Sequence, residues 1–175
     1  GGEVPDGPRR QEPLSMTRHE KIAIGGIIET RGLVLVRVLG ARKGPGVAGT
    51  TLSALGRHGI NVLCVVCFSD LSGHDNICFA INRGDLDQAL GLLQTVREEI
   101  EAASVEVVRN CGVISVYGPH FSERPAIAGL IFDTLVRAEV AVHAISTSIS
   151  TVSCVVDEAQ LETGLEQLGQ TFLIP

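Results

Sequence analysis

The sequence predicts an α+β protein built from two ferredoxin-like units, each with the element order β-α-β-β-α-β and an antiparallel sheet covered by helices on one face. Three observations support this prediction. The 175 residues are 45% hydrophobic but only 3% aromatic, so the core must be aliphatic. Strand-like apolar runs and helix-like apolar spacing alternate along the chain in the stated order. The same series then occurs a second time.

The first unit contains four predicted strands and two predicted helices. Helix 47–57 should end at Gly59, because glycine readily adopts the left-handed conformation that closes a helix. Asp85 precedes the second helix at a position that suits an N-cap. The segment "SDLSGHD" is rich in turn formers and predicts a hairpin loop. The elements in order are a strand at 33–39, a helix at 47–57, strands at 60–68 and 76–83, a helix at 85–100 and a strand at 105–110.

The second unit repeats the first. "GPGVAGTTLSALGRHGINV" aligns without a gap on "RPAIAGLIFDTLVRAEVAV", with Pro45 on Pro125, Gly49 on Gly129 and Leu55 on Leu135. Agreement of helix phase, proline, the Ala-Gly pair and the following strand indicates an internal duplication. The elements predicted here are a strand at 112–118, a helix at 125–137, a hairpin at 140–147 and 151–157, and a helix at 158–172.

Two segments precede the repeated units. Residues 1–17 are rich in glycine and proline and predict a tail without a fold of its own. Residues 22–28, within "KIAIGGII", predict a short additional strand.

Charge and composition exclude several classes of function. The net charge is −6 and the pI is about 5.3, whereas a protein that binds the nucleic-acid backbone normally presents a basic face. No apolar run reaches the length of a membrane span, and no charged-then-apolar signal peptide opens the chain. Five cysteines without framework spacing suggest a reducing compartment. We therefore expect a cytoplasmic protein that contacts neither nucleic acid nor membrane.

The stretch "GPGVAG" between strand and helix resembles a dinucleotide-binding loop, and Asp70 lies about twenty residues further on, where a ribose-binding acid would be expected. However, a dinucleotide fold requires the next strand to lead into another helical crossover. Strand 60–68 instead leads through a short loop into strand 76–83, which makes Asp70 a turn residue. The features shared by both copies, a proline and small residues at a helix start, leave free N–H groups that suit a small anion.

Two further constellations are candidate chemical sites. Cys64 and Cys67 lie three residues apart on one predicted strand, so their side chains should face opposite sides and should not share a metal. The same spacing separates His143 from Ser146, which argues against a serine nucleophile with a histidine base. We expect no metal site, no cofactor and no catalytic residue.

Longer stretches of the chain resemble the regulatory half of aspartokinases. These are "GIIETRGLVLVRVLGARKGPGVAGTTLSALGRHGINVLCVV", "DNICFAINRGDLDQAL" and "AEVAVHAISTSISTVSCVVDE". The resemblance implies two ACT domains, which bind amino acids where the domains meet, and it covers the chain from about residue 22. It implies that the first ACT domain spans 29–110, and that the second comprises 18–28 plus 111–175, with the leading strand completing its sheet. No kinase domain is present, so we expect a non-catalytic regulatory protein.

The resemblance also assigns candidate effector-binding residues. It places the loop of each ACT domain opposite the partner domain's strand, and it favours the site formed by Asn61 and the loop 120–127. In the first loop, Lys43 replaces an acid that usually holds the effector's ammonium group, and Cys67 replaces a common glutamine. The candidate residues are Asn61, His120, Phe121, Ser122, Ala126, Ile127, Ala128, Lys43, Gly46, Val47, Ala48 and Val142.

Two alternatives stay open beside an amino-acid sensor that forms a homodimer. The first is an ACT pair that has lost its ligand and only docks onto a metabolic enzyme, as an interaction module or small regulatory subunit. Lys43, Cys67 and Ala141 motivate this reading, because each replaces a polar partner expected from the family. The second alternative is a nucleotide-binding enzyme, and it depends on the glycine motif alone.

Overall fold

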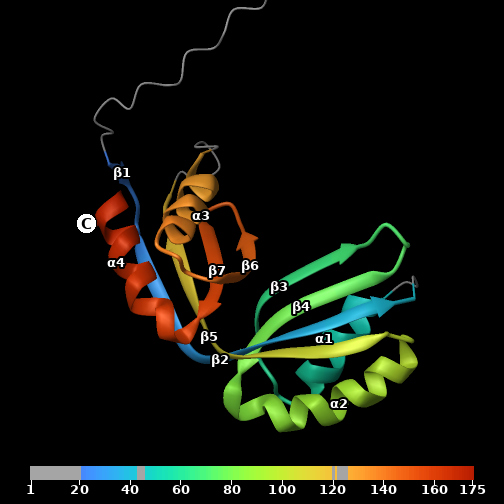
Figure 1. The fold of residues 1–175 in the computed structure, drawn as a ribbon. Coiled ribbons are helices and arrows are strands. Elements are labelled where there is room, and N and C mark those ends of the chain that lie inside the picture. Colours follow the sequence, from blue (N-terminus) through green and yellow to red (C-terminus); the bar gives the residue numbers. More distant parts are fainter. Residues whose placement is uncertain (1–20, 43–45, 120, 122–125) are drawn as a thin grey trace, which may run out of the picture.

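The computed structural model describes residues 21–42, 46–119, 121 and 126–175. Six of its strands form one antiparallel sheet in the order β3-β4-β2-β5-β7-β6. The two central strands are the longest and run through both halves of the molecule (Figure 1). The strand bounds are β2 Gly26–Ala41, β3 Val62–Ser69, β4 Asp75–Asn82, β5 Ser104–Tyr117, β6 Val142–Thr147 and β7 Thr151–Asp157.

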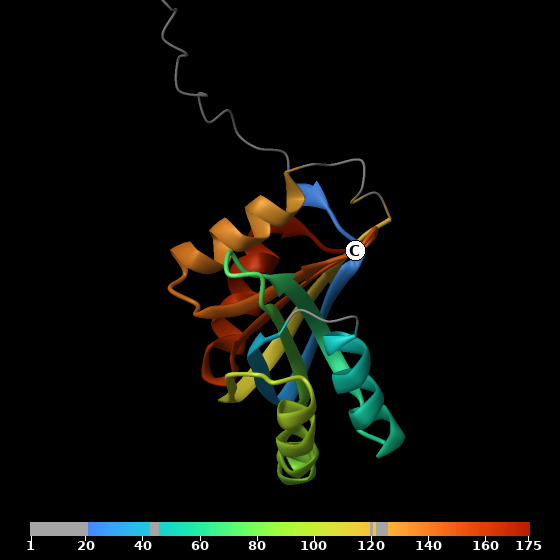
Figure 2. The same ribbon diagram turned by 90° about the vertical axis from the view of Figure 1, so that its right-hand side faces the viewer.

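Four helices cover the sheet in two pairs. Helices α1 and α2 pack on the half that contains β3 and β4, while α3 and α4 pack on the half that contains β6 and β7 (Figure 1). In Figure 2 the two helix pairs lie at opposite ends of the molecule with the strands between them. The helix bounds are α1 Val47–Arg57, α2 Leu86–Glu99, α3 Ile127–Arg137 and α4 Leu161–Thr171, and the 3-10 turns η1 Arg83–Asp85 and η3 Glu158–Gln160 precede α2 and α4.

The central strands are continuous where the sequence predicted breaks. The expected strands 22–28 and 33–39 are joined in β2, apart from the short β1 (Ile22–Ala23), and 105–110 and 112–118 are joined in β5. Irregular register between Thr30 and Leu35 marks the point where the two strands bend. Gly32 and Asn110 lie where the expected strands were separated, and both have positive φ values within the continuous strands.

The partner strands of β2 differ between its first and its later residues. Its first residues, 26–30, pair only with residues 113–117 of β5, beside β7. Its later residues, 33–38, pair with both β4 and β5. At the chain end, β8 (Phe172–Leu173) pairs in parallel with β1. The beginning of the described chain therefore belongs spatially with its end.

Side-chain alternation gives the sheet three hydrophobic clusters. Val34, Val36 and Val38 of β2 pack beneath α1 and α2, and Ile114 and Val116 of β5 pack beneath α3 and α4. The intervening residues form a third cluster on the helix-free face, where Leu33, Leu35, Ala80, Cys111 and Val155 are fully buried. This burial is possible because the edge strands β3 and β6 come into contact, so the sheet curls around its helix-free side (Figure 1).

Two local predictions about chain turns are confirmed. Gly59 has φ 74° and follows α1, and the Ile60 N–H donates to the Leu55 carbonyl. Asp70 is a turn residue, because its Oδ1 accepts N–H groups of Ser72 (2.8 Å) and His74 (3.0 Å). The antiparallel β3–β4 hairpin around Asp70 excludes the parallel crossover of a dinucleotide fold.

Asp85 occupies the expected N-cap position of α2, but its side chain does not cap the helix. The side chain donates and accepts no capping hydrogen bond there, and the backbone of Asp85 is helical. The physical reason is η1, which leads directly into α2 and satisfies the first turn through the main chain.

Candidate functional site

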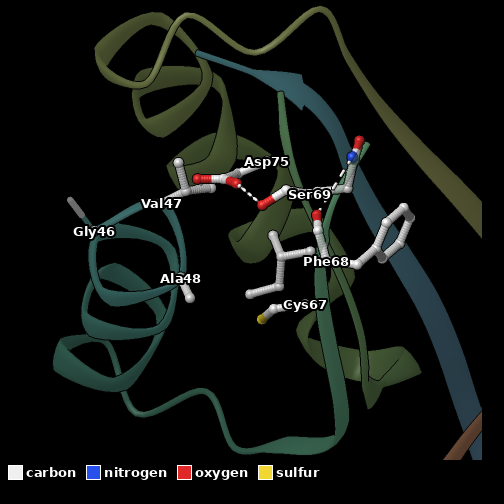
Figure 3. Close-up of a pocket in the computed structure, with 9 residues that line it drawn as sticks. Gly46, Val47, Ala48, Cys67, Phe68, Ser69 and Asp75 are labelled. Carbon is white, nitrogen blue, oxygen red and sulfur yellow. Dashed lines mark hydrogen bonds between the residues drawn. The ribbon is translucent and has the colours of Figure 1, made fainter. Parts of the chain in front are cut away.

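A cavity of about 280 Å³ lies where helix α1 begins and the β3–β4 hairpin ends (Figure 3). Gly46 forms one corner with φ 122°, a conformation that L side chains rarely adopt, which explains the glycine directly before α1. Helix, strand and hairpin each contribute to the wall. The lining residues are Gly46, Val47, Ala48, Cys67, Phe68, Ser69, Asp75, Asn76 and Ile77.

The start of α1 gives the cavity wall a group that attracts negative charge. The N–H groups of Val47, Ala48 and Gly49 lie in the first turn of α1, where a helix offers no carbonyl partner. Within the described residues, no side chain caps this helix end. Free N–H groups and the positive end of the helix dipole together suit a carboxylate or phosphate.

The β3–β4 hairpin gives the cavity wall a negative charge. Asp75 begins β4, and its Oδ1 accepts a hydrogen bond of 2.6 Å from the Ser69 hydroxyl at the end of β3. Figure 3 shows the Asp75 carboxylate reaching from the hairpin toward the start of α1. A carboxylate held in this way can bind an ammonium group.

Asn76 links the β3–β4 hairpin to strand β2 through hydrogen bonds of its side chain. Its side chain is buried, and its Oδ1 accepts the Gly40 N–H at 2.9 Å, while its Nδ2 donates to the His74 carbonyl at 3.3 Å. These bonds tie the hairpin to the end of β2. Asn76 therefore positions Asp75 and has little hydrogen-bonding capacity left for a ligand.

The floor of the cavity is apolar and small. Cys67 points toward α1, whereas the Phe68 ring points away from the cavity (Figure 3). Burial, and secondarily the Asp75 carboxylate, raise the pKa of the Cys67 thiol, so it lines the site as a neutral group. Ile77 and Val47 are buried beside it.

Three of the predicted site residues line this cavity, namely Gly46, Val47 and Ala48. Asn61 is exposed and Val142 packs on the core beneath α3, and neither residue is part of the cavity wall. Lys43 lies outside the described residues. Among the described residues of one chain, Val142 on the strand expected to face the first loop therefore does not share a cavity wall with Gly46, Val47 and Ala48.

The predicted second site is only partly described, since His120 and Ser122 lie outside the described residues. Ala126 is exposed and Ala128 is half-buried at the start of α3. The Ile127 side chain was expected to line this site, but it is 2% exposed and belongs to the core. Phe121 packs against the same core, with its ring over Gly118. Only main-chain groups of Ile127 are left to contact a ligand.

Sequence reasoning missed Ser69, Asp75 and Asn76. Ser69 and Asp75 flank "DLSGH" and were interpreted as part of a polar turn, whereas Asn76 was interpreted as the first residue of the returning strand. A signal was present nonetheless, because a ferredoxin-like unit places the first helix start and the central hairpin at the same end of the sheet. Polar residues at both borders of the hairpin therefore face the start of α1.

The two histidine and cysteine constellations have different outcomes. Cys64 packs against the helix-free cluster while Cys67 lines the cavity beside α1, so the predicted opposite orientation holds. The prediction for His143 and Ser146 is wrong, because a bulge between Val142 and Ala144 shifts the alternation and places both on the helix-free face. His143 Nε2 contacts Asp157 Oδ1 at 2.7 Å instead of forming a catalytic pair.

Metal ligation and membrane crossing can be assessed for the residues that the structure describes. Among them, no group of three or more His, Cys, Asp and Glu side chains is arranged to hold a metal ion. Within the same ranges, every helix is too short or too polar to cross a membrane.

Comparison with known proteins gives consistent matches. The ACT domain family matches residues 114–172. Aspartokinase of Geobacillus stearothermophilus is 26% identical over 162 residues, which is 93% of this chain and 38% of that protein. Aspartate kinase of Pseudomonas fluorescens is 29% identical over 156 residues, 87% of this chain and 37% of its own length. The chain thus spans under two-fifths of these curated relatives.

Solved structures match over nearly the whole chain. One chain of the aspartokinase alpha and beta subunits superposes with a TM-score of 0.77 at 28% identity, covering 85% of this chain and 98% of that one. The ligand-free regulatory subunit of aspartate kinase from Thermus thermophilus shares the fold, with a TM-score of 0.78 at 20% identity over 86% of this chain and 99% of its own. Residues 114–172 thus match the ACT domain family, and the chain as a whole is similar to the regulatory region of aspartokinases.

Proposed function

We propose that this chain is a non-catalytic regulatory protein whose first ACT domain binds a small amino acid in the cavity at the start of α1. The observation that carries the proposal is that groups of opposite charge, the start of α1 and the Asp75 carboxylate, line one small cavity. Free N–H groups of Val47 and Ala48 would receive the α-carboxylate, and Asp75 would receive the α-ammonium group. A zwitterion satisfies both groups at once.

The cavity wall defines the kind of side chain that fits. Cys67 is neutral, and Ile77 and Val47 are apolar and buried. A long cationic side chain would find no second acid among the residues of the wall. We therefore favour a small, uncharged amino acid over lysine.

We further propose that the domains are 29–110 and 18–28 plus 111–175, and that a second copy of the chain completes the sites. Residues 26–30 pair with β5, which in turn pairs with β7. This supports assigning the leading strand to the second ACT domain. Asn61 is exposed and lies outside the cavity wall within one chain, so a partner copy would have to bring it to the α3 loop. In this arrangement the protein is a cytoplasmic homodimer, and the resemblance to regulatory subunits supports a role in controlling an enzyme.

A thermal-shift screen with each of the twenty common amino acids tests the proposal. A ligand that binds only the folded state stabilises it by about 2.7 kcal/mol at a concentration roughly a hundredfold above Kd. Asp75→Asn should weaken the binding of the active amino acid by about tenfold or more, since a charge-assisted hydrogen bond is lost. Asp87→Asn, an exposed change on α2, is the matched control and should bind normally.

The alternative is an ACT pair that docks onto an enzyme without a ligand. Cys67 in the cavity wall favours this alternative, because a neutral thiol offers a ligand no strong hydrogen bond. No thermal shift with any amino acid at millimolar concentration, together with a stoichiometric enzyme partner in purification, would establish this alternative and reject the sensor.

A further inference from the structure

A second cavity, of about 270 Å³, lies on the helix-free side of the sheet where β3 approaches β6. Strands from both halves of the molecule line it, and the start of α1 is not part of its wall. Most of its wall is apolar. The lining residues are Arg37, Leu39, Val66, Phe68, Cys78, His143, Ala144 and Ile145.

Arg37 is the permanent cation of this cavity. It is half-buried on β2, and within the described chain it forms no ion pair with a carboxylate. Glu106 is directly opposite Arg37 in the β2–β5 register, but it is exposed and makes no ion pair with it. A half-buried guanidinium surrounded by apolar side chains gains most from an anion that enters the cavity.

The other polar groups of the cavity are already committed or neutral. His143 Nε2 is held by Asp157 Oδ1 at 2.7 Å, which fixes the ring and lets Asp157 balance any charge on it. The Cys78 thiol lies beside Arg37 on the neighbouring strand, and burial raises its pKa more than the guanidinium lowers it. Neither group competes with an anion for Arg37.

We infer that this cavity is a second ligand site, which binds a small monocarboxylate with an apolar body through the guanidinium of Arg37. The planar fork of arginine matches a carboxylate with two parallel hydrogen bonds. Leu39, Val66 and Ala144 supply apolar surface for the rest of the ligand. A phosphate dianion fits less well, because one guanidinium in a mostly apolar wall cannot replace its hydration.

A pair of isosteric probes tests this inference. We would titrate 4-methylpentanoate and the neutral 4-methylpentanamide into ¹⁵N-labelled protein and follow the amide shifts. The acid should bind at least about tenfold more tightly than the amide, since the charge-assisted bonds are absent in the latter. The shifts should centre on Val66, Phe68 and Ala144, and the start of α1 should be unaffected.

Variants make the test specific to Arg37. Arg37→Met should remove the preference for the acid, and Arg37→Lys should keep part of it, because the charge stays while the fork is lost. Arg109→Met, an exposed change on β5, is the matched control. Asp75→Asn should leave binding of 4-methylpentanoate unchanged, so failure of the amino-acid proposal would not affect this one.

Several results would overturn the inference. Equal affinity for acid and amide, unchanged acid binding by Arg37→Met, or shifts confined to the start of α1 would each do so. If Arg37→Met does not fold, as judged by far-UV circular dichroism, the wild-type acid-to-amide ratio and Arg37→Lys decide the question.

Discussion

The Ser69 hydroxyl donates a hydrogen bond of 2.6 Å to Asp75 Oδ1 across the mouth of the β3–β4 hairpin. Among the described residues that line the cavity at the start of α1, Asp75 is the only acid, and this bond fixes one of its oxygens. The geometry of the proposed ammonium site therefore depends on a hydroxyl that need not contact the ligand.

Ser69→Ala should weaken amino-acid binding, but by less than Asp75→Asn. A few-fold loss is expected from a single hydrogen bond worth about 1 kcal/mol, whereas the loss of the carboxylate removes the charge itself. Isothermal titration with the amino acid found in the thermal-shift screen measures both changes. Ser53→Ala, exposed on α1, serves as the control. A Ser69→Ala protein that binds as weakly as Asp75→Asn would mean that Asp75 has no direct role.

Two glycines of α4 should respond in opposite directions to alanine. A Cβ at Gly164 would lie 2.7 Å from Ile114 Cδ1 and 3.1 Å from Leu135 Cδ2, so Gly164→Ala should lower the free energy of unfolding by about 1–3 kcal/mol through overpacking. A Cβ at Gly169 would meet nothing within 4 Å, so Gly169→Ala should raise it by about 0.5–1 kcal/mol. Urea denaturation of both variants checks the pair. Equal effects would contradict the close approach of α4 to the sheet.

Glu139→Gly should stabilise the protein by about 1 kcal/mol. Glu139 has φ 58° after α3, at the position that Gly59 occupies after α1, and a left-handed conformation costs a side-chain-bearing residue about that amount. Glu139→Ala is the control, since it removes the carboxylate without relieving the backbone. Similar stability of both variants in thermal unfolding would assign the effect to charge.

The five cysteines should react slowly in the folded protein. Burial raises the pKa of every thiol, and it raises the pKa of Cys154 to about 12. Because the thiolate is the nucleophile, only the exposed Cys67 should react measurably with an aromatic disulfide reagent at neutral pH. The proposed amino acid should protect Cys67, which lines its cavity. Rapid reaction of all five thiols in native buffer would refute this view.

Asp70 should make the protein less stable in acid. Hydrogen bonds from the His74 and Ser72 N–H groups lower the pKa of its carboxyl below the usual value. A lowered folded-state pKa stabilises the fold above the unfolded-state pKa, and this contribution is lost as the pH falls through the folded-state pKa. Asp70→Asn should flatten the pH dependence of stability over that acidic range. A pH profile identical to wild type would show that the turn does not depend on the charge.

The sequence determined the features that depend on neighbours along the chain. The duplication, the four helices and the hairpin around Asp70 follow from apolar periodicity and turn chemistry, which are local. Gly59 could be identified for the same reason, since only its own backbone conformation matters.

Tertiary structure decided the features that depend on one strand lying beside another. The bulges at Cys64 and near His143 arise from pairing, so alternation along the sequence could not give the face on which His143 lies. Only contact between β3 and β6 curls the sheet, buries Leu35 on a face without helices and encloses Arg37 in a cavity. Asp75 likewise faces the start of α1 because the fold brings these two segments together. They are far apart along the chain, and no periodic pattern in the sequence indicates that they are neighbours.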